Sequence, residues 1–217
     1  MRDRNAPLTA ADLPALAWDK MDGLLPAAVQ DAGSGRLLML GYMDRAALAA
    51  TLDSGFVTFF SRSKGRLWQK GETSGNRLSL VAINEDCDGD ALLVAARPEG
   101  PTCHTGAASC FGGDAPAGPG WLAELSGIVA ARAASNDEAS YTRKLIDAGP
   151  ARIAQKVGEE GVEIALAAVT RDKEGLGEEI ADLLYHLAVL MEVRGLGWDE
   201  VVAVLKARHA SSARASS

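Results

Sequence analysis

Hydrophobic residues follow two different periods along this chain. In the first half, short apolar runs bounded by Gly, Asp, Asn or Pro indicate β-strands. The predicted strands are residues 24–30, 36–43, 56–62, 77–84 and 91–97. One helix is predicted after the second strand, with Asp44 as its N-cap, apolar positions through Leu52 and Gly55 past its end. Residues 9–18 are expected to form a short helix or an irregular arm.

A segment rich in glycine and proline, residues 112–120, interrupts this pattern, because such a composition cannot sustain a helix or a strand. Beyond it, apolar residues recur at the helical period over residues 121–134, 138–147, 151–170, 177–194 and 198–209. The end after Ala210 is expected to fray. The sequence therefore predicts an α+β protein. A mainly antiparallel β domain with one or two helices (1–113) is followed by a linker (114–120) and an all-α helical bundle (121–217).

Size and charge narrow the functional classes. The chain has 217 residues, of which 47% are hydrophobic, and this is typical of a soluble globular protein with one large or two small domains. A net charge of -7 argues against nucleic-acid binding, because no run of lysine or arginine offsets the carboxylates. The longest apolar run, near residues 183–191, is too short to span a bilayer. We therefore expect a cytoplasmic protein that binds neither nucleic acid nor membrane.

The first candidate site is the acidic segment Asp86-Cys87-Asp88-Gly89-Asp90 at the end of a predicted strand. Alternation along an extended chain would put the three aspartates on one side, around a hard cation. Cys87 would then point the other way, toward a softer metal. An acidic turn with one buried cysteine explains the same residues.

The remaining two cysteines, Cys103 and Cys110, stand seven residues apart in a glycine-containing loop. An odd number of cysteines fits no secreted disulfide framework, so metal ligation or burial is favoured over bridging. Three thiolates would leave one position of a tetrahedral zinc ion free, as in catalytic zinc sites. His104 is a candidate general acid, general base or substrate contact, and a surface histidine is the alternative.

A third group of residues offers hydrogen-bond donors and positive charge to a phosphate monoester. It lies in the segments 61–64 and 68–76, whose glycines allow close backbone approach. The candidate substrate contacts are Arg62, Ser63, Trp68, Lys70, Gly71, Glu72, Ser74 and Gly75. A hairpin connection alone would explain the glycines but not so many donors.

Together, the run 68–76, the aspartate segment and Cys103-His104-Thr105-Gly106 with Ser109-Cys110-Phe111 resemble the phosphoribosyl-AMP cyclohydrolase family, over residues 24–113. That resemblance implies a homodimer in which zinc is held by Cys87 of one subunit and by Cys103 and Cys110 of the other. It also implies that Asp86, Asp88 and Asp90 bind magnesium. Zinc suits the hydrolysis of a purine ring, because it lowers the pKa of coordinated water to about 7.

The predicted helices carry a second group of carboxylates. Glu159, Glu160 and Glu163 share an arc of about 100° on one helix, and Glu179 and Asp182 stand at i, i+3 on the next. Two antiparallel helices with these faces opposed would form a cage for magnesium and pyrophosphate. Two solvated acidic faces are the alternative. Both clusters, however, border apolar segments. Only Lys156, four residues before Glu160, could neutralise one of these carboxylates within its own helix.

Residues 121–209 resemble the phosphoribosyl-ATP pyrophosphatase family of all-helical pyrophosphohydrolases. The motifs are Ser140-Tyr141-Thr142-Arg143-Lys144-Leu145, Lys156-Val157-Gly158-Glu159-Glu160 and Glu179-Ile180-Ala181-Asp182-Leu183-Leu184-Tyr185-His186. The resemblance implies magnesium-assisted attack of water on the α–β phosphoanhydride. The residues it implies are Glu159, Glu160 and Glu163 as catalytic groups, Glu160, Glu163, Glu179 and Asp182 as magnesium ligands, and Lys144 and Lys156 as phosphate contacts. His186, on an apolar face, is predicted to be a core histidine.

The two resemblances concern consecutive reactions of histidine biosynthesis, which favours a bifunctional enzyme that uses Zn²⁺ and Mg²⁺. One alternative is a cyclohydrolase fused to a general nucleotide-sanitising pyrophosphatase. Another is a zinc-stabilised dimerisation module without activity.

Overall fold

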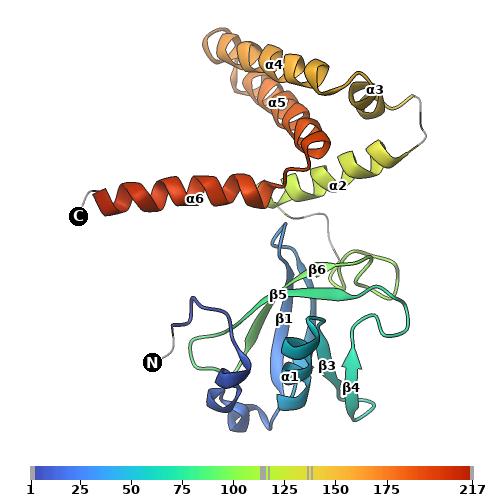
Figure 1. Ribbon diagram of the computed structural model, residues 1–217, viewed down its shortest axis with the longest axis vertical. Coiled ribbons are helices and arrows are strands. Elements are labelled where there is room, and N and C mark those ends of the chain that lie inside the picture. Colours follow the sequence, from blue (N-terminus) through green and yellow to red (C-terminus); the bar gives the residue numbers. More distant parts are fainter. Residues whose placement is uncertain (1–2, 113–115, 117, 136, 138, 216–217) are drawn as a thin grey trace. The chain divides into compact units, whose positions relative to one another are not determined.

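The computed structural model describes residues 3–112, 116, 118–135, 137 and 139–215, with the side chains up to residue 209. It divides the chain into two compact units, Met1–Gly120 and Trp121–Ser217 (Figure 1). Residues 1, 2 and 113 of the predicted β domain, 114, 115 and 117 of the predicted linker, and 136, 138, 216 and 217 of the predicted helical domain lie outside the described residues. Gly118–Gly120 form one turn of 3₁₀ helix where we expected no helix.

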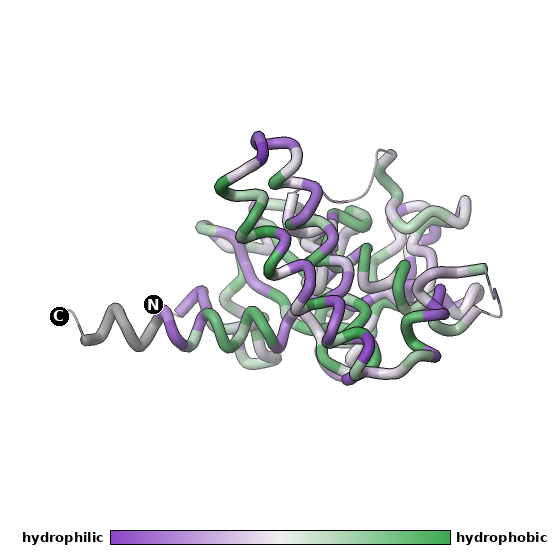
Figure 2. The backbone as a smooth tube through the Cα atoms, turned by 90° about the horizontal axis from the view of Figure 1, so that it is seen from above, coloured by the Kyte–Doolittle hydropathy of each residue, from purple (hydrophilic) through white to green (hydrophobic). Residues whose placement is uncertain are grey.

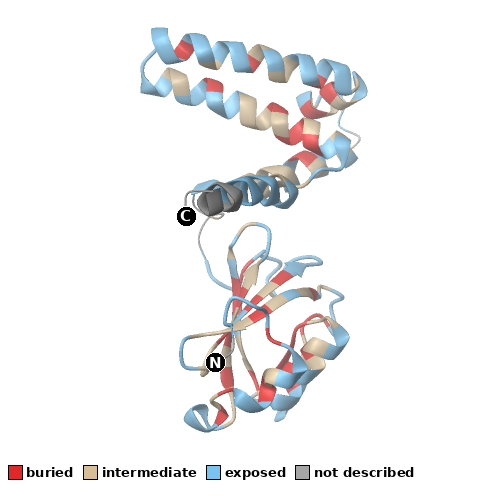
Figure 3. Ribbon diagram, turned by 60° about the vertical axis from the view of Figure 1, so that its left-hand side comes forward, coloured by how far each residue is buried: buried red, intermediate tan, exposed pale blue. Residues whose placement is uncertain are grey.

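A mixed four-stranded sheet in the order β2-β1-β6-β5 forms the centre of the first unit. Its strands are β1 (Leu25–Asp31), β2 (Leu37–Met43), β5 (Leu78–Glu85) and β6 (Leu92–Pro98). Two of the pairings are antiparallel, and β1 runs parallel to β6. Every second residue of β1 and β6 is buried, so one face of the sheet packs on the core, as Figure 3 shows.

Helix α1 (Arg45–Ser54) begins and ends where the sequence predicts. Its N-cap, Asp44, accepts a hydrogen bond from the backbone N–H of Ala47, and Gly55 ends the helix in the left-handed conformation. Strand β3 (Thr58–Ser61) pairs with β4 (Arg66–Gln69) in a separate antiparallel hairpin. We did not predict β4, because the segment is short and glycine-rich on its C-terminal side.

Residues 9–18, expected as a short helix or an irregular arm, contain all of the first of two 3₁₀ helices, Ala10–Ala15, and the first residue of the second, Trp18–Met21. The arm is fixed to the sheet, since the backbone N–H of Leu8 donates to the carbonyl of Ile83 at 2.7 Å. Trp18 is buried and donates through its indole N–H to the carbonyl of Leu13.

The second unit is entirely helical in its described part. Its helices are α2 (Trp121–Ala134), α3 (Tyr141–Asp147), α4 (Pro150–Thr170), α5 (Lys173–Arg194) and α6 (Trp198–Ala215). Helix α5 begins four residues earlier than predicted, because Asp172 caps it by accepting from the N–H of Gly175. Helix α6 extends beyond the predicted end at residue 209. Hydrophobic and hydrophilic stretches follow one another at short intervals along the backbone (Figure 2).

The helical unit has a small core. Its buried cluster consists of Val129, Leu145, Ile153, Ala188 and Val189, with partly buried residues such as Trp198 packed around it. In contrast, α4 exposes a stripe of large apolar side chains, with Val162 61%, Leu166 58% and Val169 80% exposed. Among the residues that the structure describes, every helix is too short or too polar to cross a bilayer.

Candidate active sites

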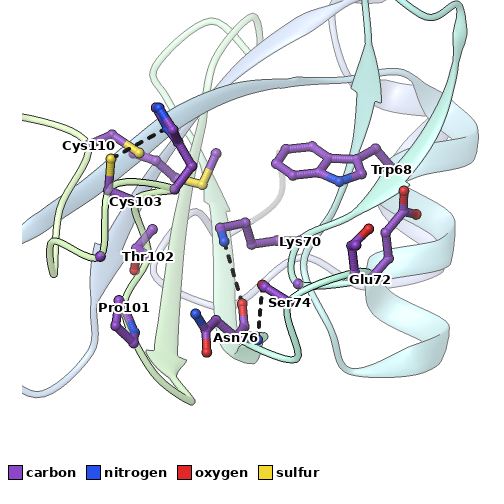
Figure 4. Close-up of a pocket in the computed structure, with 14 residues that line it drawn as sticks. Trp68, Lys70, Glu72, Ser74, Asn76, Pro101, Thr102, Cys103 and Cys110 are labelled. Atoms are coloured by element: carbon purple, nitrogen blue, oxygen red, sulfur yellow. Dashed lines mark hydrogen bonds between the residues drawn. The ribbon is translucent and has the colours of Figure 1, made fainter.

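A cavity of about 420 Å³ in the first unit brings together residues from two loops. Strand β4 contributes Trp68, and the loop after it contributes Lys70, Gly71, Glu72 and Ser74. The loop after β6 contributes Cys103, His104 and Cys110. Figure 4 shows the two sulfur atoms close together on one wall, Trp68 and Glu72 on the other, and Lys70 between them. Most of the predicted substrate contacts therefore share one cavity with two predicted zinc ligands and His104.

The two cavity thiols differ in acidity. The hydroxyl of Thr105 donates to the sulfur of Cys103 at 3.1 Å and lowers the pKa of that thiol. The pKa of the Cys110 thiol is raised, although most of this residue is exposed. The larger cause is desolvation of the sulfur, and the smaller is the neighbouring Cys103. The Nδ1 atom of His104 lies 3.8 Å from the sulfur of Cys103.

Lys70 brings a buried positive charge to the cavity. Its side chain is buried, and within the described part its ammonium has one hydrogen bond, to the carbonyl of Asn76 at 3.5 Å, and no carboxylate partner. The loop that follows turns at Gly71, where φ is +84° and a Cβ atom would collide with the backbone of Asn76. Only glycine permits that turn, so the sequence fixes the backbone on which Lys70 and Ser74 stand.

Arg62 and Ser63 line a different hollow, of about 590 Å³, which shares Met39 and Trp68 with the first cavity. The guanidinium of Arg62 stacks on the ring of Tyr42, 3.8 Å from its centroid. Sequence reasoning grouped these two residues with Lys70 and Ser74, but the structure separates them because they stand at opposite ends of the β3–β4 hairpin. Gly75 does not line either cavity.

The aspartate segment differs from its prediction in one respect. Cys87 does not point away from the aspartates: ligand atoms of Asp86, Cys87 and Asp88 lie within 4.8 Å of one another. Strand β5 ends at Glu85, so the alternation that we assumed ends there, and the chain turns. The carboxylate of Asp86 holds this turn by accepting from the backbone N–H groups of Asp90 and Ala91.

Lys20, which sequence reasoning missed, supplies a positive charge to this turn. Its ammonium lies 2.6 Å from a carboxylate oxygen of Asp88 and 3.5 Å from one of Asp90. The hydrogen bond from Lys20 lowers the pKa of Asp88. A residue 68 positions away gave no local signal in the sequence.

Cys87 lies far from the other two cysteines within one chain. It precedes β6 whereas Cys103 follows it, and a seven-residue strand spans roughly 20 Å at about 3.3 Å per residue. The N–H of Cys110 also donates to the carbonyl of Leu38, at the end of the sheet opposite to the turn of Cys87. One chain therefore does not bring its three thiols to one metal ion.

In the helical unit, ligand atoms of Glu160, Glu179 and Asp182 lie within 4.8 Å of one another. Glu160 and Glu179 are buried, whereas Glu163 and Asp182 are exposed, so the alternative of two solvated faces fails for the first pair only. The neighbouring carboxylates, Glu160 first, raise the pKa of Glu163. Negative charge is thus concentrated where the two helices meet.

Positive side chains border this carboxylate cluster. Lys156 lies 2.8 Å from a carboxylate oxygen of Glu159 and 3.0 Å from one of Glu160, which raises the pKa of Lys156. Arg171, which was not predicted, lies 2.5 Å from a carboxylate oxygen of Glu179. Lys144 is exposed on α3.

Two family models match the chain, that of phosphoribosyl-AMP cyclohydrolase over residues 39–112 and that of phosphoribosyl-ATP pyrophosphohydrolase over residues 122–209. A histidine biosynthesis bifunctional protein HisIE from Shewanella oneidensis is 55% identical over 206 residues, 95% of this chain and 97% of that protein. This chain belongs to the HisIE family. The HisIE proteins of Xanthomonas campestris pv. campestris (59% over 199 residues, 91% of this chain and 94% of that protein) and Escherichia coli K12 (54% over 204 residues, 93% and 99%) agree.

Membership of the HisIE family confirms both resemblances and the enzyme class. Each family match falls within one of the two compact units, and together they include every predicted site residue. Lys20 lies before the first match. The roles of the individual residues stay predictions.

Proposed function

We propose that the helical unit hydrolyses phosphoribosyl-ATP to phosphoribosyl-AMP and pyrophosphate. The β unit then opens the adenine ring of phosphoribosyl-AMP by hydrolysis to the formimino carboxamide ribotide. The observation that carries this proposal is the cavity that combines two thiols, an imidazole and a buried ammonium without a carboxylate partner in the described part. The helical unit, which comes second in the chain, therefore makes the substrate of the β unit, which comes first.

The thiols of Cys103 and Cys110 suit Zn²⁺, because thiolate sulfur is one of its preferred ligands. The third thiol, Cys87, stands at the other end of β6 in the same chain. We infer a homodimer in which Cys87 of the partner subunit completes the site. The exposed apolar stripe on α4 supports association of the helical units as well, since such stripes usually mark interfaces.

When bound, the zinc ion supplies water of lowered pKa, about 7 in catalytic sites, as the nucleophile. The chain's own residues do the rest. His104 stands beside Cys103 and moves the proton from the attacking water to the ring nitrogen that is released when the C–N bond breaks. Trp68 offers a flat face to the purine, and Lys70 binds a phosphate group of the substrate.

Magnesium fits both acidic clusters, because carboxylate oxygens are its preferred ligands. In the β unit we assign it to Asp86, Asp88 and Asp90, and in the helical unit to Glu160, Glu163, Glu179 and Asp182. The raised pKa of Glu163 supports a cation there, since a positive charge would offset the repulsion among these groups. Glu159, Glu160 and Glu163 are the candidates that activate water for attack on the phosphoanhydride, with Lys144 and Lys156 as phosphate contacts.

Steady-state assays on the intact chain test the substrate. We expect kcat/KM for phosphoribosyl-ATP to exceed that for ATP and for oxidised nucleoside triphosphates. Preference for the oxidised nucleotides would instead establish a sanitising pyrophosphatase fused to a cyclohydrolase.

Replacement of Cys103 by Ser tests the catalytic role of zinc. We expect loss of ring opening and of bound zinc, while pyrophosphate release persists because it belongs to the other unit. Equal loss of both activities together with unfolding would favour a structural zinc site in a dimerisation module. The matched control is Ala108→Ser, at an exposed position of the same loop and outside the predicted ligand set.

A further inference from the structure

His186 contacts the proposed magnesium cluster although it was expected to be a core histidine. It is buried on α5, and its Nδ1 atom lies 2.9 Å from the backbone carbonyl of Asp182 and 3.5 Å from the Oε1 atom of Glu160. Lys156 contacts the same oxygen of Glu160 at 3.0 Å. Lys156 of α4 and His186 of α5 thus both approach the same carboxylate oxygen of Glu160.

The surroundings of His186 define which nitrogen carries its proton. A backbone carbonyl only accepts hydrogen bonds, so Nδ1 must carry a hydrogen, which it donates to the carbonyl of Asp182 while Glu160 lies beside it. In the neutral ring Nε2 is then an acceptor, and the hydroxyl of Tyr141 lies 3.2 Å from it. Tyr141 therefore donates to Nε2 and fixes the ring with its N–H on the backbone carbonyl of Asp182, beside the Glu160 carboxylate.

We propose that Tyr141 and His186 are positioning residues that hold the Glu160 carboxylate in place for a divalent cation. This inference rests on the proposed function of the helical unit. The pair connects α3, α4 and α5, and it gives a role to Tyr141 of the Ser140–Leu145 motif, of which only Lys144 has one so far. Hydrogen-bond partners of metal-binding groups typically change metal affinity or activity by about 10-fold to 100-fold when they are removed.

Three substitutions separate positioning from general packing. Tyr141→Phe removes only the hydroxyl, and His186→Leu removes the ring nitrogens. His186→Asn keeps an N–H donor near the place of Nδ1. The matched control is Tyr185→Phe, because the Tyr185 hydroxyl bonds to Thr142 instead and its ring also lies beside His186.

The first measurement is the Mg²⁺ concentration that gives half-maximal pyrophosphate release by the full-length protein. We expect an increase of several-fold for Tyr141→Phe and of about 10-fold or more for His186→Leu. His186→Asn should restore most of the loss, and adding Tyr141→Phe to it should change nothing further. Tyr185→Phe should behave like the unchanged chain, and ring opening by the β unit should be unaffected in every variant.

The second measurement is Mn²⁺ binding without substrate, by calorimetry, in full-length protein whose Asp88 and Asp90 are changed to Asn. We expect the Mn²⁺ affinities of the variants to fall in the same order as their Mg²⁺ dependence. Unchanged Mg²⁺ and Mn²⁺ dependence in Tyr141→Phe would overturn the proposal, as would failure of folded His186→Asn to restore binding. Since Tyr141 is half exposed, that variant remains informative if His186→Leu unfolds. If the unchanged chain releases no pyrophosphate, the proposed function fails, whereas Mn²⁺ binding still tests the positioning role.

Discussion

Cys103 and Cys110 line one cavity, but their pKa values shift in opposite directions. The hydroxyl of Thr105 stabilises the thiolate of Cys103, whereas desolvation disfavours that of Cys110. In metal-free protein, Cys103 should therefore react with iodoacetamide before Cys110 as the pH rises, because its thiolate forms first. Mass spectrometry of the alkylated peptides measures this order.

Thr105→Val should remove the faster alkylation of Cys103, since valine has a similar shape but no hydrogen-bond donor. Thr102→Val, in the same loop, is the control. Equal reactivity of the two thiols in the unchanged chain would refute the assigned effect of Thr105.

Neighbouring glutamates of α5 should differ sharply in their effect on pyrophosphate release. Glu179→Gln removes a buried charge from the cluster with Glu160 and Asp182, so we expect a loss of about 10-fold or more. Glu178→Gln, one position away and exposed, should leave the activity within about twofold, since surface changes have small effects. Steady-state kinetics at saturating Mg²⁺ distinguish the two, and equal losses would argue against the cluster.

At the residue scale, spacing identified the residues whose partners are near in sequence or recur at the helical period. The cluster of Glu160, Glu179 and Asp182 is of this kind. Lys20 escaped prediction, and Tyr141 was named within a motif without a role, because their partners lie 68 and 45 residues away. The opposite placement of Cys87 and Cys103 follows from the length of β6, a property of the strand rather than of either residue.

At the scale of elements, two glycines should respond oppositely to alanine. Gly161, inside α4, has open space where a methyl group would be added, so Gly161→Ala should stabilise the fold by up to about 1 kcal/mol. Gly41 of β2 faces the buried ring of Phe59, with which the added methyl would collide, so Gly41→Ala should destabilise it by about 1–3 kcal/mol. Urea unfolding at fixed protein concentration measures the free energy of unfolding of both variants. A change of the same sign in the two would contradict the packing described.

Element prediction succeeded where capping residues and period agreed, as for α1 between Asp44 and Gly55. It failed at β4, whose four residues are too few to establish a period. The start of α5 was predicted late because Gly175 and Gly177 disguise a first turn that Asp172 caps. The parallel pairing of β1 with β6 was not predicted, since it joins segments far apart in the chain.

At the scale of the whole molecule, the two activities should be separable because they belong to different compact units. Each unit thus serves as the internal control for the other. The zinc site cannot form within one chain, since we infer that it needs two copies of the β unit.

Complementation between two inactive variants tests this shared site most directly. Cys87→Ser and Cys103→Ser should each abolish ring opening, and pyrophosphate release should persist in both. When the two are unfolded and refolded together in equal amounts, half of the dimers pair one variant with the other and contain one intact site of two. Ring opening should then return to about a quarter of the unchanged activity, whereas a mixture that stays inactive although mixed dimers form would contradict a zinc site shared between subunits.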